Sequence, residues 1–218
     1  MTPAPAAADG TRRPVGRPKG PTVDPAVRRA ELLDAATRVI RRRGPGAPMD
    51  ELAAEAGLTK PVLYAHFGDR QGLASALAER FVGQIGQRLV AAFVSETSPR
   101  RQLHQALDAF VGFIEEDPNV YQFIVREAVT SASAGAAPIA RLNVFDALGR
   151  LITAGLTQQL TATGLDTTKA EPMAFATMGM VFGATEWWLD RRTMTREELV
   201  DLLAGLLWDG LSRGPAPV

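Results

Sequence analysis

The chain has 218 residues, with 24 Lys and Arg, 24 Asp and Glu and no Cys, so its formal net charge is zero. Apolar residues make up 46% of it, which is enough for a hydrophobic core and excludes global disorder. The lack of Cys excludes a disulfide scaffold, a thiol nucleophile and a thiolate metal site, and it fits a protein of the reducing cytoplasm.

The charge is distributed unevenly along the chain. Residues 1–70 contain twelve Lys and Arg against eight Asp and Glu, a net of +4, whereas residues 71–218 have a net of −4. This division favours a basic contact surface attached to an acidic body, although a solvated basic tail would produce the same counts. No secretory signal is expected, and the most apolar stretch, residues 173–189, is predicted to be a buried helix because polar residues interrupt it.

The first predicted element is a helix that follows a polar tail. Residues 1–23 are rich in Pro, Ala, Gly and Arg and are predicted to form a disordered basic tail. Asp24 and Pro25 supply an N-cap and a first-turn proline, and apolar residues at helical spacing continue to about Arg43. Gly44 is expected to end this helix.

Two short helices follow, at about 49–56 and 59–67, and Gly57 between them allows a left-handed turn. Thr59 is expected to cap the second of them with its side chain. Six longer helices are predicted beyond them, at about 70–95, 100–116, 119–132, 138–163, 168–191 and 195–212. No stretch alternates with a period of two, so the predicted fold is all-α, with a three-helix head at 24–70 and a helical body at 71–218.

The two short helices form a helix-turn-helix whose second helix is suited to the major groove of DNA. Leu63 and Phe67 are spaced i, i+4 and face the core, which directs Lys60, Val62 and Ala65 outward. A lysine can donate to guanine O6 and N7, and a small apolar side chain can pack on a thymine methyl group. The flanking side chains suited to phosphate oxygens are Thr59, Tyr64, His66 and Arg70.

The segment 53–73 resembles the DNA-binding signature of the TetR/AcrR family of bacterial transcriptional regulators. The most specific part is Leu63-Tyr64-Ala65-His66-Phe67, which follows the turn Gly57-Leu58-Thr59. The resemblance implies that Tyr64, His66 and Arg70 contact the DNA backbone. It also implies that the helical body encloses a ligand pocket and that its last two helices form a dimer through a four-helix bundle.

Two positions depart from the patterns that they otherwise match. Pro48 stands where the family usually has Thr or Ser before the second helix, so a phosphate contact from that position is not expected. In the tail, residues 14–20 look like an AT-hook, in which Arg17 would enter the minor groove of A·T-rich DNA. Val15 replaces the Arg usual in such a hook, and a solvated basic tail is the equally weighted alternative.

The body contains an apolar set of side chains that could enclose a ligand. Few of them are charged, so a mostly apolar or aromatic small-molecule effector is expected. Arg126, Glu127, His104 and Asn143 could add polarity, although residues of these types are more often structural. The predicted pocket residues are Phe110, Phe113, Tyr121, Ile124, Leu148, Ile152, Met178 and Phe182.

The last two predicted helices carry more apolar area than one small body needs. Gly179 and Gly183 are spaced to let two helices approach closely, although each costs about 1 kcal/mol of helix propensity. The predicted homodimer interface includes Gly179, Gly183, Trp187, Leu203 and Leu207. A two-fold axis would match a palindromic operator with half-sites roughly 34–36 Å apart.

These patterns favour a cytoplasmic DNA-binding regulator without a cofactor or metal, most simply a repressor that a small effector releases from its operator. One alternative is an architectural DNA-binding protein without ligand control, which a solid body would favour. An all-α enzyme is the other alternative, but the sequence has only two His and no recognisable catalytic or phosphate-binding motif.

Overall fold

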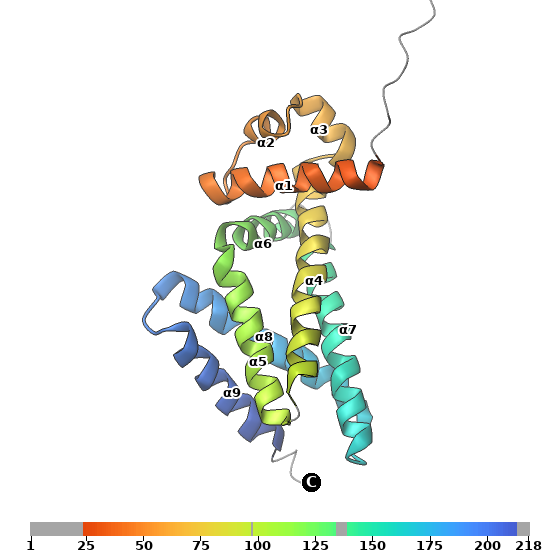
Figure 1. The fold of residues 1–218 in the computed structure, drawn as a ribbon, viewed down its shortest axis with the longest axis vertical. Helices are drawn as coiled ribbons and strands as arrows, with labels where there is room; N and C mark the ends of the chain where they lie inside the picture. Colours follow the sequence, from red (N-terminus) through yellow and green to blue (C-terminus); the bar gives the residue numbers. More distant parts are fainter. Residues whose placement is uncertain (1–23, 97, 134–138, 213–218) are drawn as a thin grey trace, which may run out of the picture.

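A computed structural model describes residues 24–96, 98–133 and 139–212, and every regular element in these ranges is helical (Figure 1). This confirms the predicted all-α class. The elements are α1 (Pro25–Arg43), α2 (Met49–Glu55), α3 (Lys60–Phe67), α4 (Arg70–Ser95), α5 (Pro99–Glu116), α6 (Pro118–Ser133), α7 (Ile139–Ala162), the 3₁₀ turn η1 (Thr167–Lys169), α8 (Ala170–Arg191) and α9 (Arg196–Ser212).

Helices α1 to α3 form a head at one end of the molecule. Leu32 and Val39 of α1, Leu52 of α2 and Leu63 of α3 are at most 1% exposed, and they join the hydrophobic core there. Gly57 has a φ of +68°, which is the left-handed conformation that the turn between α2 and α3 requires. The head therefore has the predicted helix-turn-helix arrangement.

The helix α4 leaves the head and runs along the body, where α5, α6 and α7 pack against it (Figure 1). Helix α8 packs mainly on α7, and α9 packs mainly on α5. Helix α4 begins at Arg70 and continues from the head into the body, so a division of the chain after residue 70 stays a prediction. None of the described helices is long and apolar enough to cross a membrane.

The helix ends show where the local predictions were right and where they were wrong. The side chain of Asp24 accepts a hydrogen bond from the Ala26 amide at 2.8 Å, as predicted. Thr59 occupies the N-cap of α3, but its side chain makes no cap hydrogen bond, so the expected side-chain cap is absent. A cap that the sequence reading missed is Asp69, which accepts from the Gly72 amide at 2.7 Å and starts α4.

Candidate nucleic-acid interface and ligand-binding body

The recognition helix α3 is anchored on one side and open on the other. Leu63 and Phe67 are 1% and 8% exposed and belong to the core. Val62 is 42% exposed, and Ala65 and His66 are also exposed. The helix thus presents a short, mostly uncharged ridge to solvent, as the spacing predicted.

Lys60 and Tyr64 lie at the start and middle of this helix. The Lys60 ammonium lies 3.4 Å from Asp50 and 6.0 Å from the centre of the Tyr64 ring, and its side chain is 42% exposed. Exposed pairs of this kind contribute about 0–1 kcal/mol, so a base or phosphate can replace Asp50 at small cost. Tyr64 is half-buried against the core, which fixes its ring direction.

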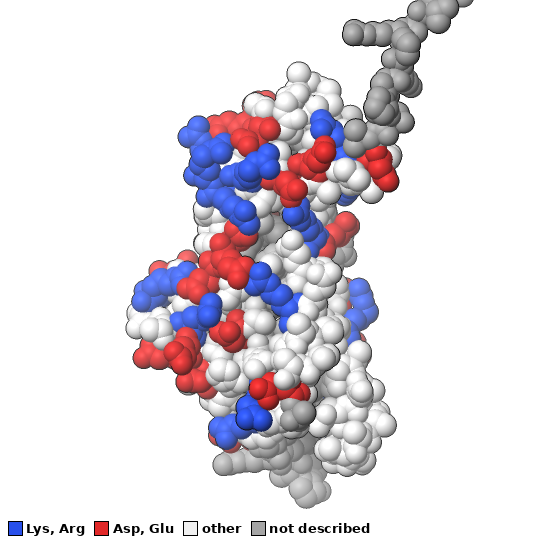
Figure 2. Space-filling view, in the orientation of Figure 1, with Lys and Arg blue, Asp and Glu red and all other residues white. Residues whose placement is uncertain are grey.

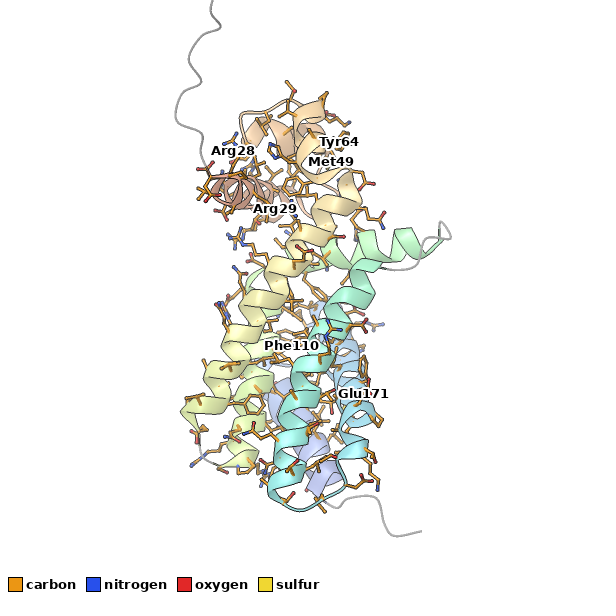
Figure 3. All side chains as sticks on the ribbon, turned by 90° about the vertical axis from the view of Figure 1, so that its right-hand side faces the viewer. Arg28, Arg29, Met49, Tyr64, Phe110 and Glu171 are labelled. Carbon is orange, nitrogen blue, oxygen red and sulfur yellow. The ribbon has the colours of Figure 1, made fainter. Side chains whose placement is uncertain are left out.

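Arg29 supports the other end of the recognition helix, a role that the sequence reading did not find. Its guanidinium stacks 4.9 Å from the centre of the Phe67 ring and donates to the His66 carbonyl at 3.4 Å. Both Arg29 and Tyr64 lie in the head, at the end of the molecule away from Phe110 (Figure 3). The N-terminal half of α1 therefore holds the C-terminal turn of α3.

Arg70 is held by other groups of the protein. Its guanidinium donates to Glu127 of α6 at 2.6 Å and to the Ala47 and Pro45 carbonyls at 2.5 and 2.9 Å. These partly buried contacts join the head to the body, and the phosphate contact expected of Arg70 stays a prediction. Arg17, the other predicted basic contact outside the recognition helix, lies outside the described residues.

The basic residues at the C-terminal end of α1 are largely paired. Arg38 and Arg42 donate to Glu55 at 2.9 and 3.2 Å, and Arg43 donates to Glu51 at 2.7 Å. The hydrogen bond from Arg38, and after it the one from Arg42, lowers the pKa of the Glu55 carboxyl below its ordinary value. Figure 2 accordingly shows blue and red side by side at that end of the head, while the tip above is mostly uncharged.

The predicted pocket residues form a packed aromatic cluster in the body. The ring centres of Phe110 and Phe182 lie 4.8 Å apart, those of Phe81 and Phe113 lie 4.6 Å apart, and Tyr121 lies 6.5 Å from Phe182. All eight predicted residues are buried except Ile152, which is half-buried. The structure places seven of them in the hydrophobic core and Ile152 against it, and their role as a ligand pocket stays a prediction.

The Tyr121 hydroxyl adds the polar group of this cluster. It donates to the Glu186 carboxylate of α8 at 2.9 Å, which connects α6 to α8 through the aromatic rings. Glu186 was not among the residues that the sequence singled out. A distinct surface pocket of about 370 Å³ lies elsewhere, at the joint of head and body, and is lined by Arg41, Glu116, Asp117, Pro118 and Asn119.

The predicted dimer residues divide into two groups. Gly179, Gly183 and Trp187 of α8 are exposed, with Trp187 45% exposed. Leu203 and Leu207 are only 2% and 5% exposed within the subunit, where α9 packs mainly on α5, so they offer little surface to a partner and their place in an interface stays a prediction. The large apolar residues of α8 and α9 that are exposed are Phe175, Met180, Trp187, Leu202 and Leu206, at 38%, 43%, 45%, 51% and 55%.

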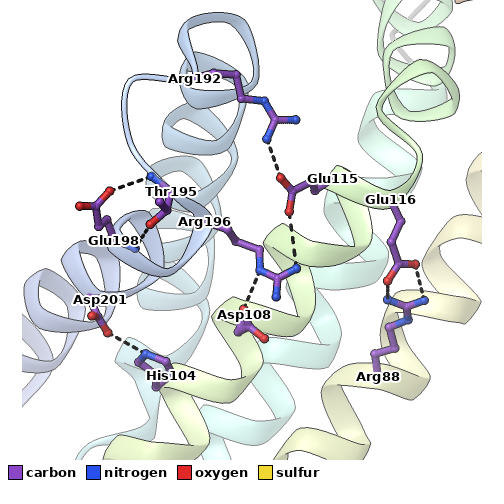
Figure 4. Close-up of polar contacts among 10 residues, drawn as sticks. All are labelled: Arg88, His104, Asp108, Glu115, Glu116, Arg192, Thr195, Arg196, Glu198 and Asp201. Atoms are coloured by element: carbon purple, nitrogen blue, oxygen red, sulfur yellow. Dashed lines mark hydrogen bonds and ion pairs between the residues drawn. The ribbon is translucent and has the colours of Figure 1, made fainter.

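A set of ion pairs fixes α9 on α5 (Figure 4). Arg196 contacts Asp108 at 3.0 Å and Glu115 at 3.5 Å, and His104 lies 2.8 Å from Asp201. A capping box begins α9, since Thr195 and Glu198 exchange hydrogen bonds at 2.7 and 3.2 Å. In the described part of the chain, no three His, Asp or Glu side chains are grouped to hold a metal ion.

Comparisons with known proteins agree with this architecture. The chain is 31% identical over 215 residues to the HTH-type transcriptional activator FasR of Mycolicibacterium smegmatis. The matched region covers 94% of this chain and 93% of FasR. A TetR-like transcriptional regulator from Rhodococcus sp. RHA1 superposes with a TM-score of 0.56 at 27% identity, over 89% of this chain and 100% of that chain. FadR from Bacillus subtilis, solved in complex with stearoyl-CoA, superposes with a TM-score of 0.62 at 19% identity, over 82% and 96% of the two chains.

Two family models divide the chain between them. Residues 32–77, which form most of the helix-turn-helix head, match the model described as bacterial regulatory proteins of the tetR family. Residues 88–216, which form most of the body and more than half of the chain, match the model described as a tetracyclin repressor-like C-terminal domain. With its exposed recognition helix and helical body, the chain belongs to the TetR family of DNA-binding transcriptional regulators.

Proposed function

We propose that this regulator binds a palindromic operator as a homodimer, with one α3 helix in the major groove of each half-site. The observation that carries the proposal is the exposed ridge of α3, which is held rigidly by Leu63 and Phe67 and leaves Lys60, Val62 and Ala65 free to reach base edges. Lys60 is suited to guanine, and Val62 to a thymine methyl group. Tyr64, His66 and Thr59 flank the ridge and are placed to donate to phosphates.

The dimer is proposed to form through α8 and α9. The supporting observation is the exposed apolar surface of Met180, Trp187, Leu202 and Leu206, with Gly179 and Gly183 allowing a close approach. Exposed apolar side chains that cluster on one face are typical of protein interfaces. Two-fold symmetry through this surface repeats the recognition helix on a palindrome.

The DNA-binding proposal is tested by removing the two most informative side chains of α3. Lys60→Ala and Tyr64→Ala together should reduce affinity for duplexes selected from a random library by at least about 100-fold, because each base or phosphate contact contributes about 1–3 kcal/mol. Electrophoretic mobility shift or fluorescence anisotropy measures the loss. The variant should remain a dimer of unchanged helix content.

Lys169→Ala is the matched control, since it removes the same charge from η1 in the body. It should bind the selected duplexes as the wild type does. Retained sequence-specific binding by the Lys60 and Tyr64 variant would contradict the proposed interface.

We further propose that a small, mostly apolar effector binds at the aromatic cluster of Phe81, Phe110, Phe113, Tyr121 and Phe182. The cluster joins α4, α5, α6 and α8, so a ligand that separates its rings changes how these helices pack. The Tyr121 hydroxyl and the Glu186 carboxylate supply hydrogen-bonding groups at its edge. We propose that the protein is a repressor, whose dimer blocks a promoter that overlaps its operator. Binding of the effector would then release the dimer and allow transcription.

The effector proposal is tested with dodecanoate and 2-naphthol as probes of aliphatic and aromatic ligands. At least one should raise the thermal unfolding midpoint and weaken binding to the selected duplex by tenfold or more, since allosteric coupling is typically about 1–3 kcal/mol. Phe110→Leu should diminish this response, whereas Phe93→Leu should not, because Phe93 is 48% exposed and lies outside the cluster. Equal responses in the two variants, or no response to either probe, would argue against this site.

A further inference from the structure

Arg70 occupies a position where three parts of the molecule meet. It is the first residue of α4, its hydrogen-bond partners Pro45 and Ala47 lie in the turn between α1 and α2, and Glu127 lies on α6. Its guanidinium also stacks 4.6 Å from the centre of the fully buried Phe123 ring of α6. One side chain therefore connects the recognition head to the body.

The environment of this side chain differs from that of a phosphate-binding arginine. The Arg70 and Glu127 side chains are only 27% and 17% exposed, and each of the three guanidinium nitrogen atoms donates one hydrogen bond within the protein. Partly buried hydrogen bonds to charged groups contribute about 1.5–3 kcal/mol each. These hydrogen bonds use three of the five guanidinium N–H groups, and the contact with Glu127 already neutralises the charge that a phosphate would seek.

A second contact ties the head to the same helix. Arg41 of α1 forms a bidentate ion pair with the Asp117 carboxylate, and the Asn119 side-chain amide donates to the Arg41 carbonyl at 3.0 Å. Asp117 immediately precedes α6, Asn119 lies in its first turn, and Glu127 lies more than two turns further along it. The head is thus held by α6 at two separate points, and Figure 1 shows α6 directly beneath α1.

We propose that Arg70 is a positioning residue, which through Glu127 sets the orientation of the recognition helix relative to the body and does not itself contact DNA. The inference rests on the proposed DNA-binding function and adds the residues that fix the head for it. Tyr121 and Ile124 of the aromatic cluster lie on α6 between the two attachment points. The aromatic cluster therefore shares α6 with both attachments of the head.

The test compares DNA affinity and its salt dependence in Arg70→Gln, Arg70→Lys and Glu127→Gln, with a duplex selected by the wild type. A positioning role predicts that Arg70→Gln and Glu127→Gln each lower affinity about tenfold, which corresponds to losing one charge-assisted hydrogen bond. The slope of log affinity against log salt should stay unchanged, because no phosphate contact is lost. Arg70→Lys should fail to restore affinity, because an ammonium cannot reach Glu127 and both carbonyls at once.

A phosphate contact predicts the opposite pattern, which would overturn the proposal. Arg70→Gln would then reduce the slope by about 0.9, Arg70→Lys would retain most of the affinity, and Glu127→Gln would bind DNA as the wild type does. Unchanged affinity in all three variants would equally overturn it. Arg88→Gln is the matched control, since Arg88 is also on α4, pairs with Glu116 at 2.7 Å and stacks on Phe113 within the body.

A spectroscopic measurement keeps this test separate from the proposed function. The chain has no Cys, so Ala54→Cys in α2 and Ala91→Cys in α4, both at exposed positions, can carry a pair of spin labels. Measured without DNA and diluted with unlabelled chain, the distance distribution should be narrow in the wild type and in Arg88→Gln. The distribution should broaden in Arg70→Gln and Glu127→Gln. An unchanged distribution in these two variants would contradict the positioning role. Because the measurement uses no DNA, this outcome does not depend on whether the protein binds an operator.

Discussion

Leu206→Glu should convert the protein to a monomer and abolish operator binding while leaving each subunit folded. The Leu206 side chain is 55% exposed in the subunit, so glutamate is solvated there at little cost. In the proposed α8–α9 interface the same carboxylate would be buried without a partner, which costs several kcal/mol. We expect dimer affinity to fall at least about 100-fold, measured by sedimentation equilibrium over a range of protein concentrations.

The adjacent residue supplies the matched control. Leu207 is 5% exposed and packs on α5, so Leu207→Ala should lower the free energy of unfolding by about 2–5 kcal/mol. The free energy of unfolding of both variants has to be measured at several protein concentrations, because dimerisation itself adds to apparent stability. A dimeric Leu206→Glu variant would show that the interface lies on another face of the molecule.

Gly72→Ala should displace α4 from the end of the recognition helix and destabilise the head. A Cβ at this position would lie 1.8 Å from the Phe67 carbonyl oxygen and 3.0 Å from its carbon, which are backbone atoms that no rotamer change can move. Overpacking of this kind costs about 1–3 kcal/mol or more. Operator affinity should fall with stability, because Phe67 is the last residue of α3.

Gly83→Ala is the control for this substitution in the same helix. Nothing lies within 4 Å of a Cβ at Gly83, which is exposed, so alanine should stabilise the subunit by about 0.4–1 kcal/mol. Urea unfolding of the two variants should therefore give shifts of opposite sign. If Gly72→Ala is as stable as the wild type and retains operator affinity, close packing at this joint is not required.

The head was predictable because its determinants are local. Asp24 and Pro25 begin α1, Gly57 takes the positive φ of the turn, and Leu63 and Phe67 recur at the helical period. Each signal operates within a few residues, so the positions of α1 to α3 follow from neighbouring residues. The Thr59 cap was wrong because a favourable residue type does not by itself set its side-chain direction.

The exposed face of α9 was only partly predictable because this helix is apolar on more than one side. Leu202 and Leu206 form one stripe, and Leu203 and Leu207 form another, so the helical period alone selects neither. Packing on α5, held by Arg196 and the other ion pairs of that interface, buries the second stripe and exposes the first. Only contacts between distant segments make that choice.

The division of charge between a basic N-terminal part and an acidic remainder is a property of the sequence alone, as are the all-α class and the exposed ridge of α3. The tertiary structure determines which partners the charged side chains contact. It pairs the arginines at the end of α1 with Glu51, Glu55 and Asp117, and it turns Arg70 inward to Glu127. These partners are up to 76 residues apart, and a charge count carries no information on which of them folding brings within hydrogen-bonding distance.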